Sequence, residues 1–338
     1  MDTILTHKKN QHNTGTGKIV SLQKGVIRGW IPKSANRQKL HVFINREALS
    51  NSINFYKEAN NKVYFKVSIG QEIDLFSQKQ IDLQLNGKSL KNSPIEYIDK
   101  LFFIHIPKTA GTTFRSALNT IVSDKYCFPR VKQIRLSKIY SNIDQFANGD
   151  VPFSKDVKLV YGHYPFAVST LFPHIPRKIV FLRNPIERCI SYIFHLKRVY
   201  PDKSIEQIFK IANSQMNNYQ VRFLADNNTS ILNCFKGKAV NIKALENAKK
   251  NLKSCDVIGI SERFSESITL CEKTLGLTFK KINFLNEGTN KNHDLLTEEQ
   301  FDYIVKNNTL DLLLYEYGLF LFNRRLSEIT SSVKDDYS

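Results

Sequence analysis

The sequence predicts an α/β protein in which a doubly wound, mostly parallel sheet follows a small all-β module. Two patterns indicate this fold class. From about residue 97 onward, short apolar runs alternate with segments of helical periodicity, which is typical of strand–helix–strand units. Before residue 93, short runs rich in β-branched and aromatic residues follow one another, and no long helical pattern interrupts them.

The all-β module is expected to be a small β-sandwich or barrel over residues 18–92. Asn86 and Gly87 predict a tight turn within it, and its strands are expected near 29–32 and at 41–44, 63–69 and 81–85. Aromatic side chains on the surface of such a module would suit sugar binding. Aromatic residues usually dominate small cores, however, so four of them are expected inside the module: Trp30, Phe43, Tyr64 and Phe65.

The α/β domain is expected over residues 97–326. Its strands are expected at 101–106, 157–161, 178–182 and 255–260, and its helices at 186–199, 205–212, 215–225, 242–252, 264–275, 297–306 and 309–323. The segment 91–94 is expected to be a linker. The ends of the chain, 1–17 and 327–338, are expected to be a disordered tail and a flexible tail.

The chain has 338 residues, and its 49 Lys and Arg against 31 Asp and Glu give a net charge of +18. This excess favours anionic partners, but a generally basic surface explains it equally well. The sequence has no arginine-rich arm, zinc-finger spacing or RNP-like motif, so no nucleic-acid partner is expected. It gives no indication of the oligomeric state.

The cysteine pattern and the absence of long apolar runs bear on the compartment. The five cysteines have neither CxxC nor metal-ligand spacing, which favours a reducing compartment. The polar N-terminus lacks the apolar stretch of a secretory signal, and no run reaches the roughly 18 apolar residues of a membrane span. We therefore expect a cytoplasmic protein without a membrane span and without a metal site.

The segment after the first apolar run of the α/β domain is the most informative. It consists of Pro107, Lys108, Thr109, Ala110, Gly111, Thr112 and Thr113, and a helical pattern follows it. Backbone N–H groups and hydroxyls at a helix start, together with one ammonium, suit a phosphate or sulfate. A Walker A loop has its lysine directly before Ser/Thr, whereas Lys108 precedes Gly111. The alternative is an ordinary capped helix with a solvated lysine.

Polar groups also follow two other predicted strands. His163 comes shortly after the run 157–161, and Arg183 comes directly after the run 178–182. Ligands of doubly wound sheets bind outside the carboxyl ends of the strands. Lys108, His163 and Arg183 are therefore predicted to surround one pocket.

Arg183 opens a second segment with a recognisable pattern. Pro185 is a normal helix start, and Arg188 and Ser191, three positions apart, share a helix face. Arg183 could give a bidentate contact to a terminal phosphate. The competing interpretation is a structural ion pair of Arg183 or Arg188 with Glu187 or another carboxylate.

Together, these segments resemble the two nucleotide-binding signatures of the sulfotransferases, in particular the carbohydrate sulfotransferases that include the heparan sulfate 2-O-sulfotransferases. The resemblance covers residues 98–325 and extends through the segments 218–224, 257–264 and 314–317. It implies the sulfotransferase fold, whose sheet is P-loop-like. It also implies 3′-phosphoadenosine 5′-phosphosulfate (PAPS) as the sulfuryl donor, with no metal.

The resemblance also assigns the donor contacts. The first signature would hold the 5′-phosphosulfate and the second the 3′-phosphate, while the polar loop 286–293 could cover the nucleotide. The predicted donor-binding residues are Lys108, Thr109, Ala110, Gly111, Thr112, Thr113, Arg183, Ser191 and Lys291.

The predicted reaction is an in-line attack on sulfur by a hydroxyl of a carbohydrate or another acceptor, and the basic charge is compatible with an acidic one. Charge grows on the leaving oxygen, which Lys108 is predicted to neutralise. His163 is the predicted base, because an imidazole titrates near neutral pH. The related 2-O-sulfotransferases carry His-Gly-His where this chain has Tyr161, Gly162 and His163. His105 is the competing base, but it is expected to be a core or supporting residue.

Two other functions stay open at this stage. A P-loop-type kinase or NTPase would need a lysine directly before Ser/Thr and an acidic magnesium ligand at a strand end, and neither is evident. A non-catalytic protein that binds acidic glycans or nucleotides is the third possibility. Glu262 and Arg263 follow the last predicted strand and could shape the pocket, but they are expected first to form a structural ion pair.

Overall fold

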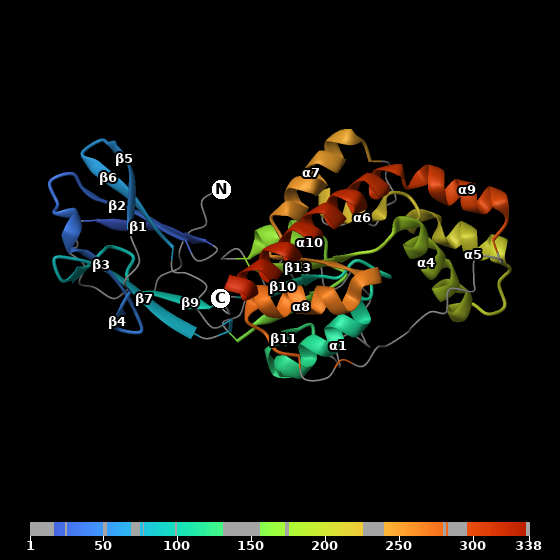
Figure 1. Ribbon diagram of the computed structural model, residues 1–338, viewed down its shortest axis with the longest axis horizontal. Helices are drawn as coiled ribbons and strands as arrows, with labels where there is room; N and C mark the ends of the chain where they lie inside the picture. Colours follow the sequence, from blue (N-terminus) through green and yellow to red (C-terminus); the bar gives the residue numbers. More distant parts are fainter. Residues whose placement is uncertain are drawn as a thin grey trace. The chain divides into compact units, whose positions relative to one another are not determined.

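The chain divides into two units in the computed structural model (Figure 1). Residues 1–100 with 172–176 form the β unit, and residues 101–171 with 177–338 form the α/β unit. The structure describes residues 17–23, 26–49, 53–68, 75–76, 78–98, 100–130, 156–172, 176–225, 240–279, 282 and 296–335. The predicted tail 1–17, except Gly17, and the loop with Lys291 lie outside the described residues.

The β unit contains two antiparallel sheets. The first has the order β1-β2-β6-β5, with β1 Lys18–Gln23, β2 Val26–Pro32, β5 Asn54–Ala59 and β6 Lys62–Ser68. The second has the order β4-β3-β7-β8, and β9 also pairs with β7; its strands are β3 Leu40–Ile44, β4 Glu47–Ala48, β7 Gln78–Leu85, β8 Lys88–Ser89 and β9 Ile95–Ile98. A short 3-10 helix, Arg37–Lys39, precedes β3.

One apolar core joins the two sheets. Ile27 and Phe65 from the first sheet and Val42 and Leu83 from the second belong to the same buried cluster. The prediction of a small all-β module is thereby confirmed, and its two sheets share one core. The predicted turn also forms, since Asn86 and Gly87 have φ of 53° and 73° and join β7 to β8, as an Asn-Gly hairpin turn requires.

The prediction that all four aromatic residues lie in this core is wrong. Phe65 is fully buried, whereas Trp30, Phe43 and Tyr64 are only partly buried. Side chains of a strand alternate between the two faces of the sheet, so Tyr64 points away from the core when Phe65 points into it. Trp30 lies directly opposite Tyr64 in the β2–β6 pairing and shares its outer face.

The segment 91–94 is not a linker between the units. The backbone N–H of Lys91 donates to the carbonyl of Gly17 over 2.9 Å, and its carbonyl accepts from Ile19 over 3.0 Å. The following strand β9 then pairs with β7. Pro94 and the polar residues before it suggested a break, but these backbone hydrogen bonds keep the segment within the β unit.

The α/β unit is built on a five-stranded sheet in which every neighbouring pair is parallel. Its order is β11-β12-β10-β13-β14, with β10 Leu101–Ile104, β11 Cys127–Phe128, β12 Leu159–Gly162, β13 Arg177–Leu182 and β14 Val257–Ile260. The chain extends first to one side of β10 and then to the other. The topological switch point therefore lies at β10, and the predicted doubly wound parallel sheet is confirmed.

Helices pack on both faces of this sheet. They are α1 Gly111–Ile121, α4 Pro185–Val199, α5 Ile205–Ala212, α6 Tyr219–Ala225, α7 Ile242–Lys253, α8 Phe264–Leu275, α9 Glu298–Asn307 and α10 Thr309–Asp335, with 3-10 helices at Asp124–Tyr126, Phe166–Leu171, Asn213–Gln215 and Ser261–Arg263. On one face, the ring centroid of Phe181 lies 4.7 Å from that of Phe114 of α1 and 5.6 Å from that of Phe264 of α8. On the other face Leu182 packs close to Gly318 of α10.

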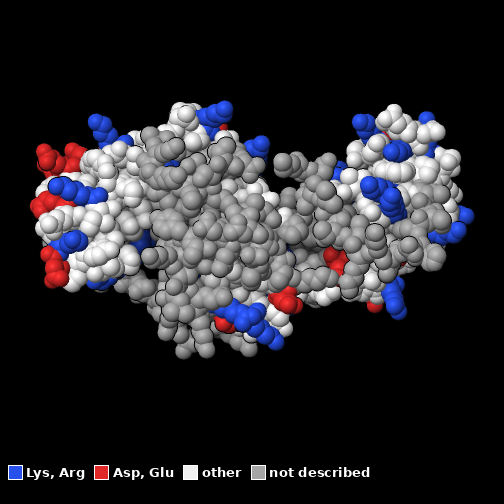
Figure 2. All heavy atoms as spheres, turned by 180° about the vertical axis from the view of Figure 1, so that it is seen from behind, with Lys and Arg blue, Asp and Glu red and all other residues white. Residues whose placement is uncertain are grey.

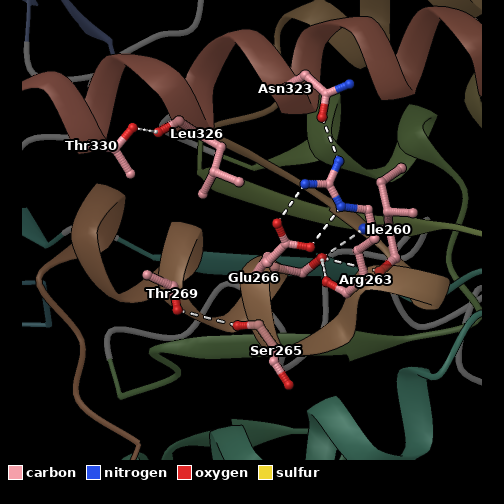
Figure 3. A network of polar contacts seen from close by, with 9 residues as sticks. Ile260, Arg263, Ser265, Glu266, Thr269, Asn323, Leu326 and Thr330 are labelled. Carbon is pink, nitrogen blue, oxygen red and sulfur yellow. Dashed lines mark hydrogen bonds and ion pairs between the residues drawn. The ribbon is translucent and has the colours of Figure 1, made fainter.

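The last helix is longer than predicted. The tail expected over 327–338 is helical as far as Asp335, and an i,i+4 ion pair of 3.5 Å between Arg324 and Glu328 supports its last turns. Arg263, at the start of α8, links α10 to α8. It donates to Asn323 of α10 and pairs with Glu266 of α8 (Figure 3).

Candidate active site

The carboxyl ends of three strands meet at one edge of the parallel sheet. Ile104, the last residue of β10, pairs with Gly162 of β12 and with Val180 of β13. The loops that follow these strands therefore begin side by side. They carry Lys108, His163 and Arg183, so the structure brings the three predicted loops together.

The loop between β10 and α1 has an unusual backbone. Lys108 and Ala110 have φ of 70° and 59°, in the left-handed region that non-glycine residues seldom adopt. Thr109 between them is fully buried, and its hydroxyl donates to the carbonyl of Ile106 over 2.9 Å. Such local strain persists only where surrounding contacts hold it, and it is concentrated at functional sites.

Helix α1 starts without a side-chain cap. Its N-cap residue is Ala110, which has no side-chain acceptor for the first N–H groups. Unsatisfied N–H groups and the positive end of the helix dipole favour an anion at this position. Thr112 is exposed there, whereas Thr113 is buried.

His105 and Gly111 fix the distance between the loop and the helix. A Cβ atom on Gly111 would lie 2.0 Å from Cδ2 and 2.1 Å from Nε2 of His105, so the ring occupies the place of a side chain. The ring also stacks on Phe103 with centroids 5.4 Å apart. Burial, followed by the charge of His163, holds the pKa of His105 well below its usual range.

His163 is held in one tautomer. Its Nδ1 lies 2.8 Å from the carbonyl oxygen of His105, and because a carbonyl only accepts, Nδ1 carries the proton. In the neutral ring the lone pair is then on Nε2. Burial lowers the pKa of His163 below its usual value, although the hydrogen bond to His105 opposes the shift. The neutral form is therefore favoured near neutral pH.

Arg183 ties two of the loops together. Its Nη1 donates to the carbonyl of Lys108 over 3.2 Å, and its Nη2 lies 3.9 Å from a carboxylate oxygen of Glu187. Its backbone N–H donates to Gln220 over 3.1 Å, and its carbonyl accepts from the same side chain over 2.8 Å. The buried carboxylate of Asp311 accepts from the backbone N–H of Gln220 over 2.9 Å.

Positive charge accumulates around Lys108. Burial and the nearby charges of Arg198 and Arg183 lower the pKa of Lys108 to about 8. Partial burial and the charges of Lys108 and Arg198 also lower the pKa of His195. Like charges lower one another's pKa only when they are close, so this edge of the sheet is a cationic site suited to a strongly anionic ligand.

The other predicted residues differ in their placement. Ala110, Gly111 and Thr112 line the start of α1, and the buried Thr109 holds the loop through its hydroxyl. Ser191 is partly buried on α4, four residues before His195. Lys291 is outside the described residues.

Three cationic or titratable residues of the site were not predicted: Arg115, His195 and Arg198. Arg115 lies four residues after Gly111 on α1, and its charge acts on both His105 and His163. His195 and Arg198 follow Ser191 at i+4 and i+7, on the same face of α4. This helical spacing was the available signal in the sequence.

The structural ion pair with Glu187, which the sequence leaves open for Arg183 or Arg188, forms at Arg183. Arg188 is fully buried; it donates to the carbonyl of Gln215 and lies 5.0 Å from the ring of Tyr219. The predicted pair of Glu262 with Arg263 is wrong. Glu262 accepts from the backbone N–H of Asn184 over 2.8 Å, while Arg263 turns to Glu266 and Asn323 (Figure 3).

A family model described as "Sulfotransferase family" matches residues 95–318, which is well over half of the chain. The chain belongs to the sulfotransferase family. The match begins at the first residue of β9 and ends within α10, so it contains both loops that carry the predicted signatures.

Several curated sulfotransferases are similar to this chain. Human heparan-sulfate 6-O-sulfotransferase 1 is 25% identical over 276 residues, which cover 67% of this chain and 66% of that protein. Zebrafish (Danio rerio) heparan-sulfate 6-O-sulfotransferase 1-B is 24% identical over 294 residues, covering 73% and 69%. The chain thus spans about two thirds of the length of these relatives. These relatives are named 6-O-sulfotransferases, whereas the group that the sequence motifs resemble is that of the 2-O-sulfotransferases.

Among solved structures, a sulfotransferase from Alicyclobacillus acidocaldarius is similar, with 14% identity, a TM-score of 0.33 and coverage of 64% of this chain and 96% of that one. This likeness is too low to support an argument. Across the described part of this sulfotransferase, every helix is too short or too polar to cross a bilayer. The same residues include no group of three or more His, Cys, Asp or Glu placed around one point.

Replacing Gly111 with Ala should destabilise the protein by about 1–3 kcal/mol, because the new methyl group overlaps the His105 ring. In a His105→Ala background the ring is absent, and the cost of the same change should fall below about 1 kcal/mol. Denaturant unfolding of the four proteins of this cycle measures the coupling. Ser116→Ala, on the exposed side of the same helix, is the control. Additive costs of the two changes would contradict the packing explanation.

Proposed function

We propose that this sulfotransferase transfers the sulfuryl group of PAPS to a hydroxyl of a carbohydrate acceptor by in-line displacement. The observation that carries the proposal is the meeting of Lys108, Arg183 and the uncapped start of α1 at one sheet edge, beside His163. Membership of the sulfotransferase family supplies the reaction class.

The residues at this edge fit a doubly anionic donor. PAPS supplies the activated sulfuryl group when it is bound. Gly111, Thr112 and Thr113 at the start of α1, with Lys108, would hold its 5′-phosphosulfate. Arg183, supported by Glu187 and Gln220, would hold its 3′-phosphate. The lowered pKa of Lys108 supports this fit, because burial and the charges of Arg198 and Arg183 disfavour its charged form, and a bound anion would stabilise that form.

Lys108 is proposed to stabilise the transition state. Negative charge grows on the oxygen that leaves sulfur, and a cation already directed at this point lowers the barrier without reorganisation. The left-handed backbone at Lys108 and the hydrogen bond from Arg183 to its carbonyl fix the start of this side chain. At neutral pH a pKa of about 8 leaves Lys108 mostly protonated.

His163 is proposed to take the proton of the attacking hydroxyl. The carbonyl of His105 fixes the proton on Nδ1, so that Nε2 presents the lone pair. The depressed pKa of His163 keeps the ring neutral and able to accept at physiological pH. His105 is the weaker candidate for this role, because its ring edge packs against Gly111 and its side chain is buried.

The acceptor is proposed to be a carbohydrate with acidic groups. The similar curated proteins are named as heparan-sulfate sulfotransferases. The net charge of +18 favours association with an acidic polymer over a neutral one.

Calorimetric titration distinguishes the proposed donor from a nucleoside triphosphate. 3′-Phosphoadenosine 5′-phosphate should bind at least about tenfold more tightly than ATP with magnesium, because Arg183 would pair with its 3′-phosphate, which ATP lacks. Arg183→Ala should remove most of this preference, and Arg177→Ala, which alters an arginine at the opposite end of β13, should preserve it. Tighter binding of ATP with magnesium would refute the proposal.

Removal of the proposed base should lower the rate and leave donor binding intact. His163→Ala should reduce kcat for sulfuryl transfer to a glycan by about 10²–10⁴-fold, the usual contribution of general base catalysis. The affinity for 3′-phosphoadenosine 5′-phosphate should change by less than about threefold. Transfer is measured as mass gain of the glycan. Full activity of His163→Ala would exclude His163 as the base and direct attention to His105.

The lowered pKa of Lys108 predicts a pH dependence of donor binding. Above about pH 8 the free protein loses this charge, so the affinity for 3′-phosphoadenosine 5′-phosphate should fall by up to about tenfold per pH unit. His163 and His195 titrate below neutral pH and do not contribute there. Lys108→Arg should abolish the dependence, because a guanidinium stays charged. The same alkaline slope in both proteins would refute the assignment.

A further inference from the structure

The first sheet of the β unit has an outer face that combines aromatic and basic side chains. We call it the aromatic–basic face. Because side chains alternate along a strand, the face is defined by the residues out of phase with the buried Ile27, Ile31, Val63 and Phe65. It consists of Lys18, Arg28, Trp30, Tyr56, Lys57, Lys62, Tyr64 and Lys66.

The aromatic residues of this face lie next to one another. Trp30 on β2 is directly opposite Tyr64 on β6. The rings of Tyr64 and Tyr56 are 6.4 Å apart, and Tyr56, at an irregularity of β5, is 52% exposed. Three large rings thus lie on neighbouring positions of three strands, and we call them the platform.

These rings are not needed for the core. Phe55 and Phe65 already contact each other with centroids 6.4 Å apart, and they pack in the interior of the β unit. Aromatic side chains gathered on the surface of a soluble protein usually mark a binding site, because they offer a large apolar surface with a polar edge.

Basic groups surround the platform. The ammonium of Lys62 lies 4.2 Å from the ring centre of Trp30, and that of Lys57 lies 5.9 Å from the ring centre of Tyr64. Arg28 and Lys66 face each other across β2 and β6. The face therefore presents several cations beside flat apolar surfaces.

No carboxylate of these four strands opposes this charge. Their single acidic residue, Glu58, lies opposite the buried Val63 and so has the opposite phase. It is already paired with Arg37 and with Lys33, the latter over 3.3 Å. On the side of the β unit that Figure 2 draws, Lys and Arg side chains (blue) are frequent, and Asp and Glu side chains (red) are few.

The spacing of the charges favours a polymer. Lys62 and Lys66 lie on the same face of one strand, four residues or about 13 Å apart. A small anion contacts one of them, whereas a chain with repeated anionic groups contacts both and also covers the rings between them.

We infer that the aromatic–basic face binds an acidic polysaccharide, whose sugar rings pack on Trp30 and Tyr64 and whose carboxylates or sulfates pair with the flanking lysines. A single-stranded nucleic acid would use similar groups. The preference for a polysaccharide rests on the proposed function, which makes such a polymer the acceptor. When the face and the candidate active site contact the same polysaccharide, the first contact raises the effective concentration of the polysaccharide at the second site.

Binding of heparan sulfate chains to the full-length protein tests the inference. Trp30→Ala should weaken this binding about tenfold through the loss of one stacked ring. Lys62→Ala/Lys66→Ala should reduce the slope of log affinity against log salt concentration by about 1–2. The matched control is Lys39→Ala/Lys88→Ala, which removes two exposed charges elsewhere in the β unit and should leave the affinity within about twofold.

The outcomes separate this inference from the proposed function. Trp30→Ala should transfer sulfate to a disaccharide acceptor as the unaltered protein does, because the short acceptor does not need the face. Binding by both face variants equal to that of the control would overturn the inference, and so would tighter binding of poly(dT) than of heparan sulfate at the same salt concentration. A protein that binds heparan sulfate through Trp30 but transfers no sulfate would overturn the proposed function alone.

Discussion

The parallel pairing of β10 with both β12 and β13 is the constraint on which the candidate site depends. It sets Ile104 beside Gly162 and Val180, so the polar segments that follow three strands begin at one edge of the sheet. The strands themselves are buried on both faces, and the free energy of this burial holds their register. The three loops that carry Lys108, His163 and Arg183 would otherwise have no reason to converge.

The contacts around this edge work mainly through the backbone. His105 holds His163 through its carbonyl and sets the approach of α1 through Gly111. Arg183 reaches the carbonyl of Lys108, and Gln220, positioned by Asp311, holds the backbone of Arg183. Cations are therefore fixed close together before any ligand is bound. Such a preorganised arrangement raises the free energy of the empty site and lowers that of a complex with an anion.

In the β unit, the alternation of side chains along each strand, with a period of two residues, decides which residues face the core. The alternation that buries Val63 and Phe65 places Lys62, Tyr64 and Lys66 on the opposite face, and the pairing with β2 adds Trp30 and Arg28. One pattern thus creates both the core and the aromatic–basic face. The expectation that Trp30 and Tyr64 are core residues failed because it considered residue type without the register between strands.

The sequence by itself determined the two-part organisation, the parallel α/β fold, most helix bounds, and the loops at Lys108, His163 and Arg183, because periodicity and helix start signals are local. Only the tertiary structure decided that Arg188 is buried, that Glu262 holds Asn184 rather than Arg263, and that 91–94 belongs to the β unit. It also brought Arg115, His195 and Arg198 to the site. Those outcomes depend on contacts between residues far apart in the chain, and a local pattern such as the spacing of His195 and Arg198 on α4 shows at most that residues share a helix face.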